Sequence, residues 1–304
     1  MRISVYLPLL LTLLVALPAP GVALWLPPAA AARCLTALAV ACAASTAWSL
    51  TLLAATLVRD VPPVIEFIQQ QGVPLGELVP TVVAVLALLV LTFGTARLVL
   101  FTVRRVATLR AVQRAFGRYG DTSLLVSNTR VPYAFTVPAR PGRIVVSTGL
   151  LAMLDTRERR AVIAHETAHL RHRHHRYQLL GDAAAALNPL LAHIRDAISF
   201  QLERWADEHA SATVSDRDLV ARTIARVALA GRDAPTGHRP AAVAFGAAAL
   251  GVRHRVIALG QAPVPRRRAV TVLSLVPATA AVVFTVNATV AFLHWAAVLA
   301  PLVR

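Results

Sequence analysis

The sequence predicts a mainly α-helical membrane protein with four transmembrane helices and an α+β domain between the third and the fourth. Of the 304 residues, 57% are apolar and only 15% are charged, and the mean hydropathy of +0.61 exceeds what the core of a soluble domain requires. Three long uncharged runs, one extended polar stretch and a fourth uncharged run follow one another along the chain, and they predict the helices and the domain in this order.

Four runs are long and apolar enough to cross about 30 Å of hydrocarbon as helices. They are Ile3 to Leu26, Cys34 to Val58, Leu78 to Ala96 with its helix continuing to about residue 101, and Ala269 to Leu293. The first run could instead be a signal peptide, cleaved among the small residues Ala19 to Ala23. We therefore expect three transmembrane helices in residues 1–103, one domain in 104–268, and the fourth helix with a short tail in 269–304.

The net charge is +16, and all 31 basic residues are arginines. Many of them follow the third run or precede the fourth: Arg97, Arg104, Arg105, Arg110, Arg114, Arg118, Arg266, Arg267 and Arg268. Arginine at the ends of membrane spans is typical of the cytoplasmic face. We expect a multi-pass protein in a bacterial plasma membrane, with the domain in the cytoplasm and no direct binding to nucleic acid.

Within the domain, β-rich runs come before helical ones. The runs Ser123 to Ser127, Val131 to Val137 and Arg143 to Ser147 are separated by turn-forming residues and predict a small sheet of three strands. Asp155 with Glu158 has the spacing of a capping box, which predicts a helix over 159–173. Further helices are expected over 190–214, 216–229 and 241–259.

The helix after the capping box carries His165-Glu166-Thr167-Ala168-His169, which has the pattern H-E-x-x-H. Two His at i and i+4 lie on one helix face and can bind one Zn²⁺, and the Glu between them can accept a proton from a water on the metal. We expect one zinc ion per chain, held by His165 and His169, with Glu166 as general base.

A catalytic zinc needs a third protein ligand. The helix over 190–214 offers Glu203 and, one turn later, Asp207. We choose Glu203 as the ligand and Asp207 as the carboxylate that holds a ligand imidazole. From the residues alone, an exposed helical Glu is an equally good interpretation of Glu203.

The segment Val131 to Pro138, the segment Gly142 to Leu151, the H-E-x-x-H helix and Glu203-x-x-Ala206-Asp207 together resemble the integral membrane gluzincins. The resemblance covers roughly residues 118–259. It extends to two branches, the HtpX and CAAX-prenyl-protease branch and the BlaR/MecR branch of antirepressor peptidases, and the arrangement of spans is similar to the second. It implies a zincin-like fold, zinc ligands His165, His169 and Glu203, Glu166 as base, Asp207 as helper, and a protein substrate such as a BlaI-type repressor.

Three departures from these families matter. The receptor members of the BlaR/MecR branch carry a penicillin-binding sensor after the fourth span, where this chain ends at Arg304, so direct β-lactam sensing is not expected. Members of both branches often have an Asp after an Arg near the end of the zinc helix, where this chain has His174 after Arg173. The HtpX branch often has Ser-Arg before its ligand Glu, where this chain has Ser199-Phe200.

Other histidines allow further hypotheses. His172, His174 and His175 could form a second metal site, although a solvated basic helix end is the simpler interpretation. His193 and His209 are candidates to stabilise the transition state. Tyr133, Ala134 and Phe135 could form an edge strand that pairs with a substrate peptide, or an ordinary core strand.

These observations favour a membrane zinc metalloendopeptidase that acts on a regulatory or membrane-associated protein. One alternative is an HtpX-like protease for membrane protein quality control, which would cut at many sites. A second alternative is a membrane signalling scaffold with a structural metal or none, although such a site needs no base at Glu166. A nucleic-acid-binding membrane protein is suggested only by the charge.

Overall fold

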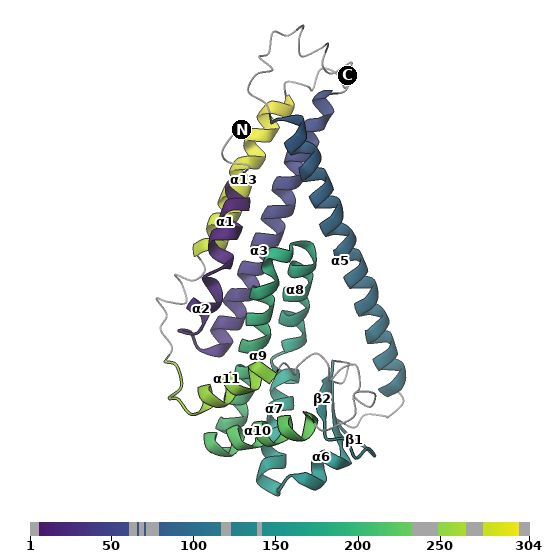
Figure 1. Cartoon of the computed structure of the whole chain (residues 1–304), viewed down its shortest axis with the longest axis vertical. Coiled ribbons are helices and arrows are strands. Elements are labelled where there is room, and N and C mark those ends of the chain that lie inside the picture. Colours follow the sequence, from purple (N-terminus) through teal and green to yellow (C-terminus); the bar gives the residue numbers. More distant parts are fainter. Residues whose placement is uncertain are drawn as a thin grey trace.

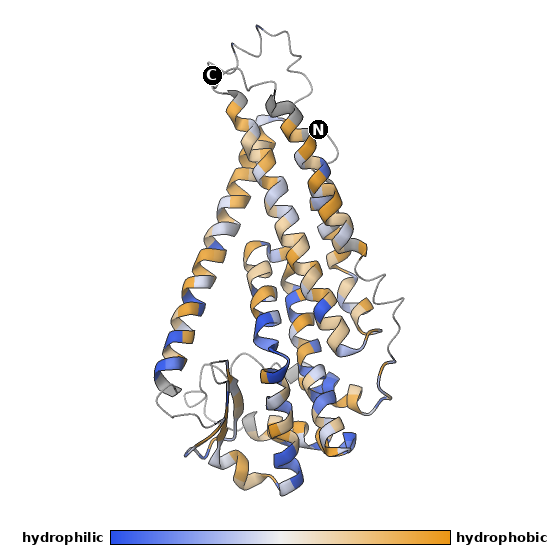
Figure 2. Cartoon of the chain, turned by 180° about the vertical axis from the view of Figure 1, so that it is seen from behind, coloured by the Kyte–Doolittle hydropathy of each residue, from blue (hydrophilic) through white to orange (hydrophobic). Residues whose placement is uncertain are grey.

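The computed structural model describes residues 6–60, 66, 70, 79–116, 123–138, 142–232, 249–265 and 276–297. Long helices gather at one end of an elongated molecule, and the small sheet with several shorter helices forms the other end (Figure 1). The apolar residues dominate the first end, and the hydrophilic residues concentrate towards the second (Figure 2). A mainly helical protein with a small sheet is therefore confirmed.

The first apolar run does not form the single helix that we predicted over Ile3 to Leu26. It forms α1 (Leu7–Ala16) and the short α2 (Ala19–Ala23), and residues 3–5 lie outside the described residues. Pro18 and Pro20 lie at the break, where proline removes backbone donors and clashes with the preceding turn. A helix of 10 residues rises only about 15 Å, half of a hydrocarbon core.

Among the described residues, two helices are long and apolar enough to cross a membrane by length and composition. The first, Pro28–Val58, consists of α3 (Pro28–Ala55) and the beginning of the 3-10 turn η1 (Thr56–Asp60). The second is Thr81–Arg114 of α5 (Thr81–Phe116). The last helix, α13 (Val276–Ala297), contains a shorter apolar segment over Ala278–Val290, and residues 269–275 of the predicted fourth run lie outside the described residues. Helix α13 packs along α3, where Trp48 Nε1 donates to Thr289 Oγ1 at 2.7 Å.

The predicted three-stranded sheet is confirmed. Its strands are β1 (Leu124–Ser127), β2 (Ala134–Val137) and β3 (Arg143–Ser147), in the order β1-β3-β2. Strand β3 is central and buried along its whole length, with β1 parallel and β2 antiparallel to it. Strand β2 therefore lies at an edge of the sheet, next to the helix α7 described below.

Short helices follow the sheet. Helix α6 (Thr148–Met153), which the sequence did not predict, begins with Ser147 as N-cap. Helix α7 (Thr156–Arg171) begins with the predicted capping box: the Glu158 amide donates to Asp155 Oδ1 at 2.8 Å, and the Asp155 amide donates to Glu158 Oε2 at 2.9 Å. These two bonds fix where the helix with the H-E-x-x-H pattern starts.

Next comes a helical hairpin, α8 (His174–Leu187) and α9 (Ala192–Val214), joined by the 3-10 turn η3 (Pro189–Leu191). We predicted α9 but no helix over 174–187. The hairpin lies between the diverging helices α3 and α5 (Figure 1). Leu35, Leu38 and Cys42 of α3 share one hydrophobic core with Ile194, Ile198 and Leu202 of α9. The stretch that we took for a separate domain is thus packed partly against the first long helix.

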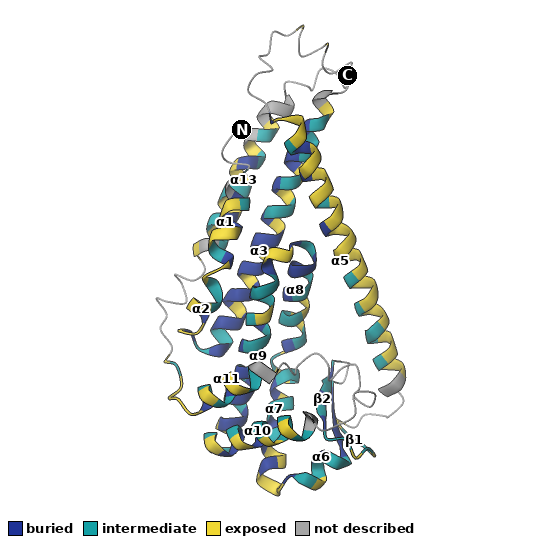
Figure 3. Cartoon of the chain, in the orientation of Figure 1, coloured by how far each residue is buried: buried dark blue, intermediate teal, exposed yellow. Residues whose placement is uncertain are grey.

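Helices α10 (Arg217–Arg232) and α11 (Ala249–Leu259) cover the sheet end of the molecule. The predicted helices over 216–229 and 241–259 correspond to them, and residues 241–248 lie outside the described residues. Arg217 joins the two elements to α9, because its guanidinium donates to Leu259 O at 2.9 Å and pairs with the Glu208 carboxylate. Most of α5, in contrast, is exposed (Figure 3).

Helix α9 ends at Ser215, which has a φ of 53° in the left-handed region that favours glycine. Because a side chain costs about 1 kcal/mol in this conformation, we expect Ser215→Gly to raise the thermal unfolding midpoint. The matched control is Ala212→Gly, three residues earlier in the helix interior, which should lower the midpoint by a similar free energy. Equal shifts of both variants in the same direction would contradict this explanation.

Candidate metal centre

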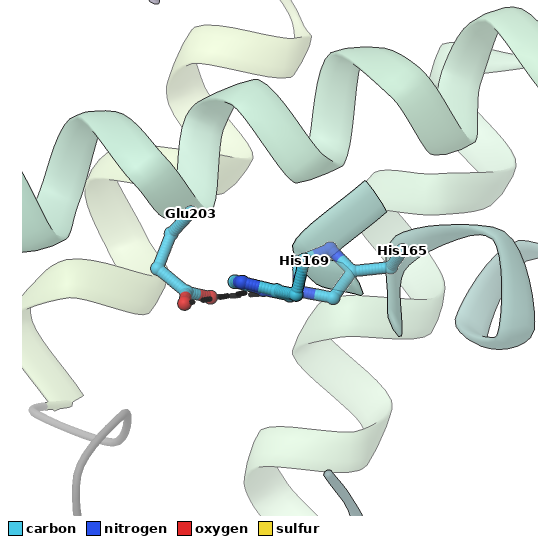
Figure 4. A group of neighbouring side chains, drawn as sticks. All are labelled: His165, His169 and Glu203. Atoms are coloured by element: carbon cyan, nitrogen blue, oxygen red, sulfur yellow. Dashed lines mark hydrogen bonds and ion pairs between the residues drawn. The ribbon is translucent and has the colours of Figure 1, made fainter. Parts of the chain in front are cut away.

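Helices α7 and α9 bring the predicted metal ligands together. His165 and His169 lie one turn apart on α7, and Glu203 reaches them from α9 (Figure 4). His165 Nε2 lies 3.1 Å from His169 Nε2, and each of these nitrogens lies 3.5 Å from an oxygen of Glu203. Within the residues that the structure describes, no other group of His, Cys, Asp and Glu converges in this way.

The separations of these atoms fit a zinc ion. A tetrahedral ion with bonds of 2.0 to 2.1 Å keeps its ligand atoms about 3.3 Å apart. The observed separations of 3.1 and 3.5 Å lie on either side of that value. Two imidazoles and one carboxylate are also the donor set that leaves one position of a catalytic zinc open.

The other nitrogen of the His165 ring is held by a carboxylate. His165 Nδ1 lies 3.0 Å from Asp207 Oδ1, as expected for a carboxylate that orients a ligand imidazole. Burial lowers the pKa of His165, but the hydrogen bonds and charges of Asp207 and Glu203 outweigh burial and raise it to about 10. Without a metal the two carboxylates thus favour a proton on His165, and a bound cation would replace the charge of that proton.

Arg255 of α11 completes the centre, and no sequence pattern predicted its role. Its guanidinium makes two bonds of 2.7 Å to the Asp207 carboxylate and one of 2.8 Å to Glu203 Oε2. Burial alone would raise the pKa of both carboxyls, but the charge of Arg255 and the hydrogen bonds and charges of the other neighbouring residues together outweigh burial and lower both pKa values. Arg255 therefore keeps the ligand Glu203 and its neighbour ionised in a buried site.

Glu166 and His169 respond differently to burial. Burial raises the pKa of Glu166 to about 7, the range in which a carboxylate can both accept and return a proton near neutral pH. Burial also lowers the pKa of His169 to about 4, so this ring is neutral and ready to bind a cation. Both side chains line the same cavity.

The remaining sequence candidates lie in different places. His193, at the start of α9, lies 2.5 Å through its Nε2 from Ala16 O, ten residues before Glu203 along the helix. His209 contacts the ring of His172 and does not line the cavity of the centre. The structure brings neither side chain beside the three converging residues, and their role in stabilising the transition state stays a prediction.

His174 lies beside the centre in an arrangement that we did not predict. Its Nδ1 is 3.0 Å from Nδ1 of His169, and its ring packs against Trp205. Our sequence interpretation of His172, His174 and His175 as a solvated basic helix end is wrong for His174, which is only 2% exposed. The cause is that α8 begins there and folds back onto the core.

The centre opens into a cavity of about 790 Å³. Apolar residues from three elements form much of its wall, including Phe135 of β2, Ile224 and Val227 of α10, and Leu109 of α5. Tyr133, Ala134 and Phe135, for which the sequence left both an edge strand and an ordinary core strand open, all line it, and β2 begins at Ala134. Arg105 of α5 and Gln178 of α8 add polar groups on the side between those two helices.

Two histidines and a glutamate on one helix, with a second glutamate that reaches the histidines from a following helix, form a ligand set suited to a metallopeptidase. The sequence profile of Peptidase family M48 matches residues 102–268, more than half of the 304 residues. The chain therefore belongs to peptidase family M48, and this membership supports a metallopeptidase function. Comparisons with curated proteins and with solved structures give no match.

We expect Arg255→Met to weaken both the fold and the metal site, because it leaves two buried carboxylates without their cation. Removing one partner of a buried ion pair costs about 3 to 5 kcal/mol, which thermal unfolding and chelator competition for zinc would detect. Arg253→Met is the matched control, since Arg253 lies two residues before Arg255 on α11 and is exposed. A loss in Arg253→Met equal to that in Arg255→Met would overturn this role.

The raised pKa of Glu166 predicts a pH-dependent effect on the metal-free protein. An acid whose folded pKa is raised from 4.5 to about 7 favours folding at low pH and opposes it as the pH rises through that range. Glu166→Gln should therefore raise the unfolding midpoint of the metal-free protein at pH 8 and have a smaller effect at pH 5.5. A difference between variant and wild type that does not change with pH would argue against a buried, neutral Glu166.

Proposed function

We propose that this protein is a membrane-bound zinc metalloendopeptidase. The observation that carries the proposal is that Glu166 shares a cavity with three residues whose donor atoms converge at zinc-like separations. A structural zinc site has four protein ligands and no use for a carboxylate base. This difference favours an enzyme over the alternative of a signalling scaffold.

His165 and His169, through Nε2, and Glu203, through its carboxylate, would hold the metal. When bound, zinc polarises a substrate carbonyl and makes water acidic enough to lose a proton near neutral pH. Asp207 orients His165, and Arg255 keeps both acidic groups ionised. The protein thus supplies a ligand set that is already close to the geometry required.

Glu166 is the residue that moves the proton. Its carboxylate accepts a proton from the attacking water and then delivers this proton to the amine that leaves when the C–N bond breaks. The pKa of about 7, which burial produces, suits both directions of transfer. The step conserves all atoms: the hydroxyl of the water stays on the acyl product, and its proton goes to the amine.

The substrate we propose is an extended peptide with apolar side chains next to the scissile bond. Strand β2 is the last strand in the sheet order β1-β3-β2 of the described residues, and its residues Ala134 and Phe135 line the cavity, so that an added strand here would extend the sheet beside the metal centre. Phe135, Ile224 and Val227 give the adjacent wall its apolar character. Backbone pairing would set the register, and this wall would select the side chains.

The membrane part of the proposal rests on α3 and α5. Both are long and apolar enough to span, and the second half of α5 carries the arginines expected at a cytoplasmic face. We therefore place the metal centre on the cytoplasmic side of a bacterial plasma membrane, in a multi-pass protein. A position beside the bilayer would restrict substrates to membrane proteins and to cytoplasmic proteins that reach the inner surface.

Among such substrates we favour a regulatory protein, for which a BlaI-type repressor is the example that the sequence resemblance suggests. The alternative is quality control of damaged membrane proteins, as in HtpX-like proteases. The two functions differ in breadth, because a regulator cuts one partner at one site and a quality-control protease cuts many unfolded chains. Mapping the products from casein and from candidate repressors separates them.

The decisive variants are Glu166→Gln and Glu203→Gln in the full-length protein in detergent. Glu166→Gln should keep bound zinc and lose hydrolysis by at least about 100-fold, because general base catalysis contributes that much or more. Glu203→Gln should lose zinc itself, measured by metal analysis after dialysis. If Glu166→Gln cuts peptides as fast as the wild type, or if the wild type holds no zinc, the proposed function fails.

A further inference from the structure

The two histidines that would bind zinc have four ring nitrogens, and three of these have an evident partner, which is either the metal or a carboxylate. Both Nε2 atoms face the metal position, and His165 Nδ1 faces Asp207. A neutral imidazole that binds a metal through Nε2 carries its proton on Nδ1, and this N–H requires an acceptor. For His169 the atom at hydrogen-bond distance is Nδ1 of His174, 3.0 Å away.

The backbone is shaped to make this contact. In a continuous helix, residues five apart point about 140° away from each other, so the rings of His169 and His174 would not meet. Between them Arg173 has a φ of 54°, a left-handed conformation that costs a non-glycine residue about 1 to 2 kcal/mol. This turn ends α7, starts α8 and places the His174 ring against His169.

The surroundings of His174 fix its ring and its tautomer. The ring packs against Trp205, with 4.8 Å between the ring centroids, and the guanidinium of Arg33 of α3 lies over the ring of Trp205, 5.0 Å from its centroid. His174 Nε2 is buried and makes no hydrogen bond in the described structure. Because His169 must donate, His174 must present the lone pair of Nδ1 and carry its own proton on Nε2.

We propose that His174 is a positioning residue, which accepts the Nδ1 proton of His169 and thereby fixes the tautomer and orientation of this zinc ligand. The neutral imidazole of His174 would thus orient His169 as the charged carboxylate of Asp207 orients His165. The inference rests on metal binding by the proposed site, but not on peptide hydrolysis. Partners of this kind change metal affinity by about 10- to 100-fold when removed.

The test compares four variants of the full-length protein in detergent by zinc affinity, measured in competition with a chelator. His174→Asn and His174→Asp each place an oxygen near the position of Nδ1, and we expect their zinc affinity to stay within about 3-fold of the wild type or, for Asp, to rise. His174→Phe keeps the ring without an acceptor, and His174→Gln places its oxygen one bond further out. Both should bind zinc about 10- to 100-fold more weakly.

A control and a second readout make the test specific. His175→Asn alters the neighbouring histidine, whose ring makes no contact with His165 or His169 within the described residues, and should leave zinc affinity unchanged. Cobalt substitution adds a spectroscopic signature, since the visible bands of Co²⁺ should broaden or weaken in His174→Phe and match the wild type in His174→Asn. Thermal unfolding of the metal-free variants shows whether each one folds.

The outcomes divide clearly. A purely packing role for His174 predicts the reverse order, with Phe tolerated and Asn harmful, and that result would overturn the proposal, as would equal affinity in all four variants. If Phe does not fold, the comparison of Asn with Gln still decides, because these differ in where the oxygen lies. If the wild type binds zinc but cuts no peptide, the proposed function fails while the role of His174 is still tested.

Discussion

The geometry of the metal centre depends on how closely α7 and α9 approach, because two imidazoles on one helix and a carboxylate on the other must meet around a single ion. Small residues make this approach possible. Ala161 and Ala164 of α7 share one hydrophobic core with Ala210 of α9, and Ala168 and Ala206 are also buried. Larger side chains there would push the helices apart, since packed interiors hold few voids.

Charge adds a second constraint. Glu203 and Asp207 bring two anions into a buried region, which is costly unless cations compensate them. Arg255 provides one cation, and the metal position provides the other. The arrangement links α11 to the centre, and the bonds from Arg217 to the end of α11 hold that helix in the position where Arg255 can reach.

Sequence reasoning found the parts of the site that follow from local spacing. An i, i+4 pair of histidines, a capping box and a carboxylate with another one turn later are patterns of single helices, and all of them appear where expected. It missed Arg255 and His174, whose roles depend on contacts between helices. Arg255 looks like its exposed neighbour Arg253 in the sequence, and nothing in a row of histidines shows that Arg173 turns the chain. The interrupted first run was detectable from Pro18 and Pro20, which we gave too little weight.

The core that Leu35 and Leu38 of α3 share with Ile194 and Leu202 of α9 has a practical consequence. The residues matched by the family profile begin within α5 and so leave α3 out. A fragment limited to residues 102–268 would expose the apolar face of α9, the helix that carries Glu203. Loss of α3 should therefore reduce both the solubility of the fragment and its ability to bind a metal. Biochemical work on the metal centre requires α3 together with a detergent or lipid that covers the apolar surface of this helix.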